Sequence, residues 1–321
     1  MQPINPKRMP KLVLKIDVDT LRGTLEGVPR LLSALAKVQA QATFLFSLGP
    51  DHTGRAIKRV FRPGFFAKVQ RTSVVSHYGI KTLLYGTVLP GPDIGKRGAT
   101  TLRQVQAAGF ECGIHCWDHF TWQDYVRHKP AAWTNKQLDK AYQRFQQIFG
   151  YPAPTHGAAG WQMNDHALSQ HAARGLQYAS DSRGSHPFIP VVNGQALAHV
   201  EMPTTLPTLD ELLGREVNGV ALDESSVAAY LLSQTDPANQ TTAQTSAQNH
   251  VFTLHAELEG MKLLPVFEQL LSGWQQQGYE LCSMSQYFHT LQTENLPKHA
   301  VTWGEVEGRS GDLLLQGARC D

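Results

Sequence analysis

Strand-like and helix-like segments alternate along most of this 321-residue chain, and no other feature limits its fold as strongly. Short β-branched or apolar runs predict strands at residues 11–17, 41–47, 110–115, 176–181, 251–255 and 279–282. Amphipathic runs between them predict helices at residues 28–38, 100–108, 135–149, 165–174, 225–233 and 263–277. Gly109, Gly150, Gly175 and Gly278 follow four of these helices, as C-terminal caps do. The alternation favours an α/β fold whose parallel sheet is either open or closed into a barrel.

Three regions interrupt this alternation. Residues 50–98 carry scattered apolar and basic side chains, and we expect a helical insertion that covers one mouth of the barrel. Residues 233–249 are predicted to form a Gln/Thr/Ala-rich, low-complexity loop. Residues 293–321 are polar and lack clear periodicity, which predicts a disordered tail. No internal repeat or boundary is evident, so residues 1–292 are expected to form a single domain.

The composition excludes several classes of protein. A formal net charge of +2 does not favour a nucleic-acid partner. The four cysteines form no CxxC pair, which favours reduced thiols in the cytosol. The first 20 residues contain no apolar signal-peptide core, and no later run of about 18 apolar residues could span a membrane. The protein is therefore expected to be soluble or peripheral.

The segment GIHCWDH places His115 and His119 four residues apart, directly after a predicted strand. On one face of a helical turn, two imidazoles with this spacing could converge on one ion. The alternative is a pair of histidines that form hydrogen bonds at a surface turn. Cys116, between them, is either a competing ligand or a buried structural thiol.

Acidic and histidine side chains also follow three other predicted strands, at Asp17 and Asp19, at Asp181, and at His255. Each has an ordinary explanation, because aspartates cap helices or form turns and a histidine in an apolar strand is often a core residue. In a parallel α/β sheet, however, ligands bind at the mouth that the carboxyl ends of the strands share. One carboxylate and two imidazoles leave open positions on a metal ion, as in a hydrolytic site. A second carboxylate could accept the proton of a water molecule, and a histidine opposite could protonate a leaving amine.

In this order, the motifs resemble those of the NodB-homology polysaccharide deacetylases, carbohydrate esterase family four. KIDVDT resembles the family's TFDDG motif, and His115 with His119 completes its HxxxH motif. The RxPxG motif is echoed only by HGAAG at residues 156–160, and TLHAE resembles the fifth motif. The match extends over residues 11–288 and implies a distorted seven-stranded (β/α) barrel.

The resemblance also implies a role for each site residue. One divalent metal ion, which could be zinc, cobalt, manganese or nickel, would be held by Asp19, His115 and His119. Asp17 would be the catalytic base, although the DVD spacing leaves the reverse assignment of the two aspartates open. His255 would be the general acid, kept charged by Asp181.

One family feature is missing, because the third motif lacks the arginine that steadies the base. His156, Arg183 or Arg22 could replace it. His156 and Arg183 are also candidates for substrate binding, together with Trp117 and Trp161, which could line a sugar pocket or could instead be packing residues.

A narrower resemblance rests on a combination of segments: DVDTLRGTLEGVPRLL, the long insertion, HCWDHFTWQ, AAGWQ, SDSRG, MPTTLPTLDE and HAELEG. Together they resemble bacterial deformylases that act on 4-deoxy-4-formamido-L-arabinose linked through phosphate to undecaprenol, for modification of lipid A with aminoarabinose. The polyprenyl-phosphate-linked substrate implies a peripheral enzyme at the cytoplasmic face of the inner membrane of a Gram-negative bacterium. Basic and apolar residues alternate at 55–62, which form either an interfacial segment or a helix that covers the barrel.

Other functions stay open at this point. The chain could be a deacetylase of another N-acyl aminosugar, including chitin or peptidoglycan, although the lack of a signal peptide speaks against those polymers. It could be a deacylase of small soluble amides. The missing third-motif arginine also allows a carbohydrate-binding homologue without catalytic activity.

Overall fold

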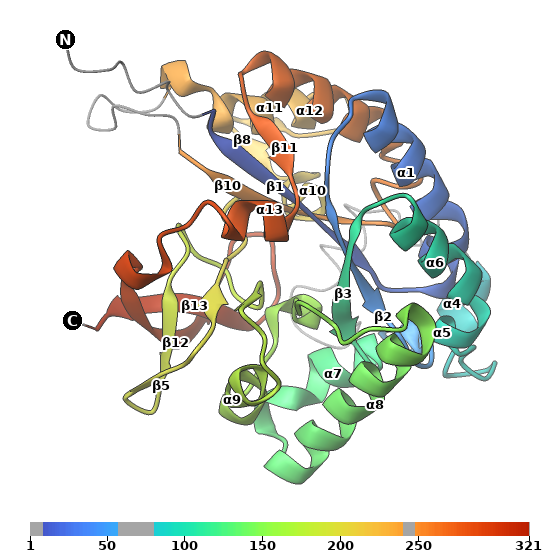
Figure 1. Ribbon diagram of the computed structural model, residues 1–321. Helices are drawn as coiled ribbons and strands as arrows, with labels where there is room; N and C mark the ends of the chain where they lie inside the picture. Colours follow the sequence, from blue (N-terminus) through green and yellow to red (C-terminus); the bar gives the residue numbers. More distant parts are fainter. Residues whose placement is uncertain (1–8, 57–79, 240–247, 321) are drawn as a thin grey trace.

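Strand β1 (Lys11–Val18) is the centre of the sheet in the computed structural model, which describes residues 9–56, 80–239 and 248–320 (Figure 1). It pairs in parallel with β10 (His250–His255) along one edge, and with β11 (Glu280–Cys282) and β2 (Thr43–Ser47) at different ends of the other. Strand β3 (Glu111–Cys116) extends the sheet beyond β2. Every residue of β1 except Lys11 is buried, because both faces of a parallel sheet are covered.

Short segments close this sheet into a barrel. Backbone hydrogen bonds of 2.8 to 3.1 Å join β3 to residues 155–157, that segment to Ser180 at the end of β4 (Tyr178–Ala179), β4 to β7 (Val200–Glu201), and Thr205 to β10. The order around the barrel is therefore β1, β2, β3, 155–157, β4, β7 and β10. This is the predicted distorted seven-stranded barrel, with three of its seven wall segments only two or three residues long.

Helices cover the outside of the barrel, and Figure 1 shows several of them following one another along its outer surface. The six predicted helices are confirmed as α1 (Val28–Lys37), α6 (Ala99–Ala107), α8 (Ala131–Phe149), α9 (Asp165–Ala173), α11 (Val227–Thr235) and α12 (Leu264–Gln276). Shorter helical segments are η1 (Gly23–Gly27), α4 (Ile80–Leu84), α5 (Ile94–Arg97), α7 (His119–Tyr125), η3 (Val126–His128), η4 (Ala159–Trp161), α10 (Leu209–Leu212), η5 (Pro237–Asn239), α13 (Met284–Phe288) and η6 (Thr293–Asn295). None of the described helices is both long and apolar enough to cross a bilayer.

Alternation along the strands decides which side chains enter the barrel. Val13 of β1 packs in one buried cluster with Tyr178, Val200 and Val251, which come from three other wall strands. This cluster therefore fills the interior of the barrel at its lower end. Side chains two and four positions further along β1 point to the same face. Lys15 and Asp17 thus lie inside the barrel, above the apolar cluster.

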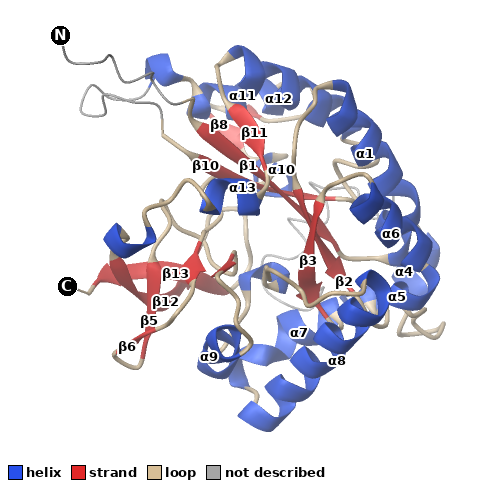
Figure 2. Cartoon of the chain, in the orientation of Figure 1, coloured by secondary structure: helices blue, strands red, loops and turns tan. Residues whose placement is uncertain are grey.

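The C-terminal residues correct the sequence analysis. Residues 293–320 are ordered rather than disordered: β12 (Lys298–Glu305) and β13 (Asp312–Arg319) form an antiparallel hairpin. The hairpin joins β5 (Ile189–Val192) and β6 (Gln195–Ala196) in a second sheet, separate from the barrel sheet (Figure 2). Leu313 and Leu314 are buried, while most of β12 is partly exposed, so only a short part of the hairpin has the apolar character that predicts a strand.

The other interruptions are only partly described. The insertion at 50–98 contains α4 and α5, but residues 57–79 lie outside the described part, and with them most of the predicted interfacial segment. Of the predicted loop at 233–249, the first residues end α11 and form η5, and residues 240–247 lie outside the described part. A small hairpin of β8 (Glu216–Val217) and β9 (Val220–Ala221) precedes α11.

Candidate metal and catalytic site

Asp19 faces both histidines of the GIHCWDH segment. Its Oδ1 lies 3.2 Å from Nε2 of His115, and its Oδ2 lies 3.4 Å from Nε2 of His119. The two histidines do not share a helical turn as predicted, because His115 belongs to β3 and His119 is the first residue of α7. They converge nevertheless, since the chain turns sharply between strand and helix. Cys116 alternates to the other face of β3 and contacts Ser47 Oγ (3.3 Å), so it is a buried structural thiol.

The donor set fits a divalent metal ion. Nδ1 of His115 lies 2.7 Å from the carbonyl oxygen of Gly157, which can only accept, so Nδ1 carries the proton in the neutral ring. Nε2 then presents a lone pair to a carboxylate oxygen of Asp19, and two acceptors in contact require a cation between them. Ligand atoms about 2.1 Å from one tetrahedral ion lie about 3.4 Å apart, close to the separations found here.

Electrostatics favours a cation at the same position. Burial would lower the pKa of His115, but the carboxylates of Asp17 and Asp19 outweigh it and raise this pKa. Burial would raise the pKa of Asp19, but His119 and His115 hold it well below its usual range. The site therefore attracts positive charge, either a proton or a metal ion.

Two carboxylates that the sequence analysis missed hold the ligands in place. Glu257 is fully buried, and its Oε1 accepts hydrogen bonds from the backbone N–H groups of Asp19 (3.0 Å) and Thr20 (2.7 Å). Asp118 is the N-cap of α7, accepts from the N–H of Thr121 (3.1 Å), and so fixes the turn that carries His119. Asp118 could have been predicted from the sequence, because an aspartate just before a helix is a typical N-cap. Glu257 could not, because its contacts with Asp19 and Thr20 join segments far apart in the sequence.

Asp17 has a cation beside it, and that cation is Lys15. Nζ of Lys15 lies 3.8 Å from Oδ2 of Asp17 and donates to the carbonyl oxygen of Ser180 (2.9 Å), and the whole lysine is inaccessible to solvent. Lys15 thus occupies the place expected for the missing arginine. The three predicted replacements do not, because His156 contacts Asp181, Arg183 pairs with Glu211, and Arg22 pairs with Glu26.

His255 stands beside Asp17 in the barrel. The two residues are register partners in the parallel pair of β1 and β10. Nδ1 of His255 is buried and has no hydrogen-bond partner within the described part of the chain. Its backbone N–H donates to Oε2 of Glu259 (2.8 Å), and burial raises the pKa of Glu259 to about 7 against the opposing effect of His255.

Asp181 does not lie beside His255 as predicted. Tyr178 points into the barrel, so Asp181, three residues later, points outward. Its Oδ1 contacts Nδ1 of His156 (2.7 Å) and its Oδ2 contacts Nε2 of His171 (2.8 Å). The carboxyl group that contacts His255 through its backbone N–H is that of Glu259.

The predicted substrate-binding residues are mostly buried in other contacts. Trp161 is 2% exposed, has a strained backbone with φ of 52°, and donates from Nε1 to Oγ1 of Thr204 (3.1 Å). The Arg183 guanidinium lies 4.9 Å from its ring centre. His156 is fully buried, so it cannot line an open sugar pocket. Trp117 is partly buried beside Arg144, and its role in substrate binding stays a prediction.

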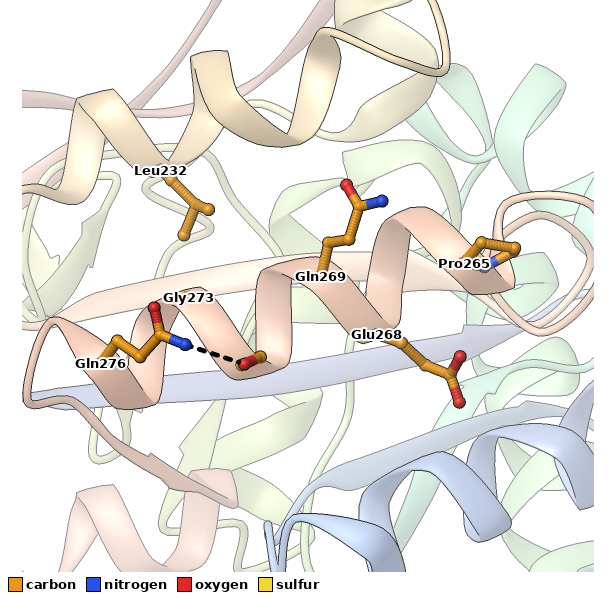
Figure 3. Close-up of a pocket in the computed structure, with 7 residues that line it drawn as sticks. Leu232, Pro265, Glu268, Gln269, Gly273 and Gln276 are labelled. Atoms are coloured by element: carbon orange, nitrogen blue, oxygen red, sulfur yellow. Dashed lines mark hydrogen bonds between the residues drawn. The ribbon is translucent and has the colours of Figure 1, made fainter.

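A surface groove between α11 and α12 is a poorer candidate (Figure 3). Its lining is made of Leu232, Pro265, Glu268, Gln269, Ser272, Gly273 and Gln276. Glu268 is the one ionisable group in that lining, and it forms an ion pair with Lys37 (2.7 Å). The groove therefore has neither metal ligands nor an acid–base pair.

Comparisons with known proteins agree with this geometry. The chain is 36% identical over 317 residues to a protein of Shewanella sediminis named probable 4-deoxy-4-formamido-L-arabinose-phosphoundecaprenol deformylase ArnD, covering 98% of this chain and 97% of that one. It is 30% identical over 295 residues to a protein of the same name from Wigglesworthia glossinidia brevipalpis, covering 92% and 98% of the two chains. A crystal structure from Mycobacterium smegmatis, assigned to the polysaccharide deacetylases, superposes with a TM-score of 0.61 at 16% identity, covering 95% of this chain and 99% of that one. No family model matches the sequence.

The metal site makes a direct prediction. Replacing His119 by alanine removes one of the three candidate ligands, so bound zinc, cobalt, manganese or nickel should fall from about one ion per chain to a small fraction of that. Metal content after dialysis, measured by mass spectrometry, checks this. The control is His166→Ala, which changes an exposed histidine on α9 and should retain full occupancy. Equal metal content in both variants would contradict the assignment.

Proposed function

The chain belongs to the ArnD family of deformylases and has the polysaccharide deacetylase fold, and from that premise we propose that it hydrolyses an N-formyl amide. The substrate is 4-deoxy-4-formamido-L-arabinose-phosphoundecaprenol, and the products are formate and the 4-amino sugar lipid. The observation that carries the proposal is the convergence of Asp19, His115 and His119 next to Asp17 and His255.

Asp17 and Asp19 have different roles in this proposal. Both oxygens of Asp19 face imidazole nitrogens, which suits a metal ligand. Oδ1 of Asp17 is buried without a hydrogen-bond partner among the described residues, which leaves it able to accept a proton. Asp19 and the two histidines would hold a divalent ion, which would supply a Lewis acid for the formyl oxygen and lower the pKa of the attacking water. Asp17 takes the proton of that water as its oxygen bonds to the formyl carbon.

His255 completes the reaction from the β10 side. As the carbon–nitrogen bond breaks, the leaving amine needs a proton, and His255 donates it. Glu259 accepts a hydrogen bond from the backbone N–H of His255 and so holds the proposed proton donor in place on β10. Lys15 keeps Asp17 in position throughout, because its ammonium is bound to the barrel wall at Ser180.

The lipid substrate suggests where the mouth of the barrel faces. Leu25 of η1 and Tyr125 of α7 are 47% and 44% exposed. They lie on the segments that follow β1 and β3, the strands whose carboxyl ends carry the metal ligands. We propose that these side chains rest on the cytoplasmic face of the inner membrane, so that the sugar of a membrane-anchored lipid reaches the metal.

The test of the proposed function is formate release. Wild-type protein should release formate from the formamido-arabinose phosphoprenol, lose activity on chelation, and recover it with added metal. His255→Ala should slow turnover at least about 100-fold, because the leaving amine loses its proton donor. The exposed His166→Ala again serves as control. A wild type that is inactive with metal supplied would refute the substrate, and acetylated aminosugars would then be tested.

Lys15 allows a second test. Lys15→Met keeps the length of the side chain but removes the charge, so Asp17 should lose its anchor and kcat should fall about 10- to 100-fold. Lys15→Arg retains a cation and should recover part of this loss. Steady-state kinetics measures kcat of each variant, and circular dichroism checks that each is folded. A fully active Lys15→Met variant would show that Asp17 needs no cation.

The membrane contact is tested by vesicle binding. A double change, Leu25→Asp with Tyr125→Asp, should weaken binding to vesicles that contain anionic phospholipid, because two charges would enter the interface. Val220→Asp is the matched control, since Val220 is 66% exposed but lies on β9. Hydrolysis of an analogue without the polyprenyl tail should be unchanged in both variants. Unaltered vesicle binding by the double variant would place the membrane contact elsewhere.

A further inference from the structure

A second histidine–carboxylate cluster lies outside the barrel wall. It contains His156, His171 and Asp181, all with no solvent exposure. The three come from residues 155–157 of the wall, from α9, and from the segment after β4. Among the described residues it is, besides the Asp19 site, the one group of this kind whose ligand-type atoms lie close enough to hold a metal.

The distances identify this cluster as a hydrogen-bonded one. Its atoms are 2.7 and 2.8 Å apart, which are lengths of charge-assisted hydrogen bonds, whereas the Asp19 site has separations of 3.2 and 3.4 Å. Burial would raise the pKa of Asp181, but the two imidazoles outweigh burial and hold this pKa well below its usual range. Asp181 is therefore an ionised acceptor between two N–H donors.

Residues 155–157 and 180–181, which carry His156 and Asp181, also contact the proposed catalytic site. Gly157, next to His156, gives its carbonyl to His115, and Ser180, next to Asp181, gives its carbonyl to Lys15. The N–H of Ser180 donates to the carbonyl of His156 (2.9 Å), which ties the two segments together. A shift of either segment would thus move a metal ligand or the cation beside Asp17.

Other contacts restrict the cluster further. Oε1 of Glu201, a fully buried carboxyl on β7, accepts from the backbone N–H groups of Asp181 (2.6 Å) and Ser182 (2.8 Å). The backbone of Asp181 is therefore fixed from β7 and its side chain from α9. The cluster links three wall segments to one outer helix by hydrogen bonds, which demand defined geometry in a way that apolar packing does not.

We propose that His171 and Asp181 are positioning residues that set the metal affinity of the Asp19 site, acting through His156 and the carbonyl of Gly157, which binds His115. This rests on the metal centre of the proposed function but not on its substrate. Removing the groups that orient a metal ligand usually weakens metal binding about 10- to 100-fold, and a contact one residue further out should have an effect at the lower end of that range.

The experiment measures the zinc dissociation constant of the full-length protein by competition with a chromogenic chelator. His171→Leu, which removes the donor to Asp181, should raise this constant about 5- to 10-fold. His171→Gln retains an N–H donor and should restore the constant to within about twofold of wild type. If the leucine variant does not fold, Asp181→Asn, which keeps the shape but not the charge, provides the measurement.

A matched control separates positioning from general stability. Asn164 caps α9 and donates to the carbonyl of Val126 (2.8 Å), so Asn164→Ala should destabilise the same helix without touching the cluster. Its Tm should fall while its zinc affinity stays that of wild type. A His171→Leu or Asp181→Asn variant with a lower Tm and unchanged zinc affinity would overturn the proposal. A wild type that binds no zinc, cobalt, manganese or nickel would instead refute the metal centre itself.

Discussion

The burial of a charged pair on the central strand is the constraint on which the rest of the site depends. Lys15 and Asp17 lie two residues apart inside the barrel, with exposed fractions of 0% and 3%. Unpaired, either would cost several kcal/mol, so the wall must supply partners at fixed positions. Ser180 gives a carbonyl to Lys15, and the ring of Trp161 lies 5.4 Å from its Nζ. The proposed base, Asp17, thus lies beside a buried lysine that is itself bound to the barrel wall.

Alternation along the wall segments links this inner site to the outer layer. A residue that faces the barrel is followed by one that faces the helices, so each segment can bind a catalytic group on one side and a helix on the other. Residues 155–157 and 180–181 use both sides in this way. Because these segments are short, they have few ladder hydrogen bonds of their own. The buried hydrogen bonds to α9 help to fix these segments, as additional ladder hydrogen bonds fix longer strands in a regular barrel.

The sequence predicted the main barrel strands and the helices around them, and it singled out the three candidate metal ligands, because each of those signals is local. Asp19, His115 and His119 follow strands whose carboxyl ends meet in any parallel barrel. Asp181 was misassigned because strand-end position says nothing about which face a side chain takes. Lys15 was missed although its spacing to Asp17 places both on one face, since a lysine near a chain end suggests solvent. Glu257 contacts Asp19 across 238 residues, and no local pattern encodes that contact.

The C-terminal hairpin of β12 and β13 shows why local sequence patterns predicted a domain that ends too early, at residue 292. Arg309 lies between β12 and β13, donates to Oε1 of Glu211 (2.6 Å), and has its guanidinium 4.8 Å from the ring centre of Trp161. Trp161 in turn packs against Lys15, the partner of Asp17, the proposed base. A chain that ended at residue 292 would keep every predicted metal ligand and acid–base residue. It would still lose one of the cations that hold a strained tryptophan in place, so the hairpin belongs to the catalytic domain for a physical reason.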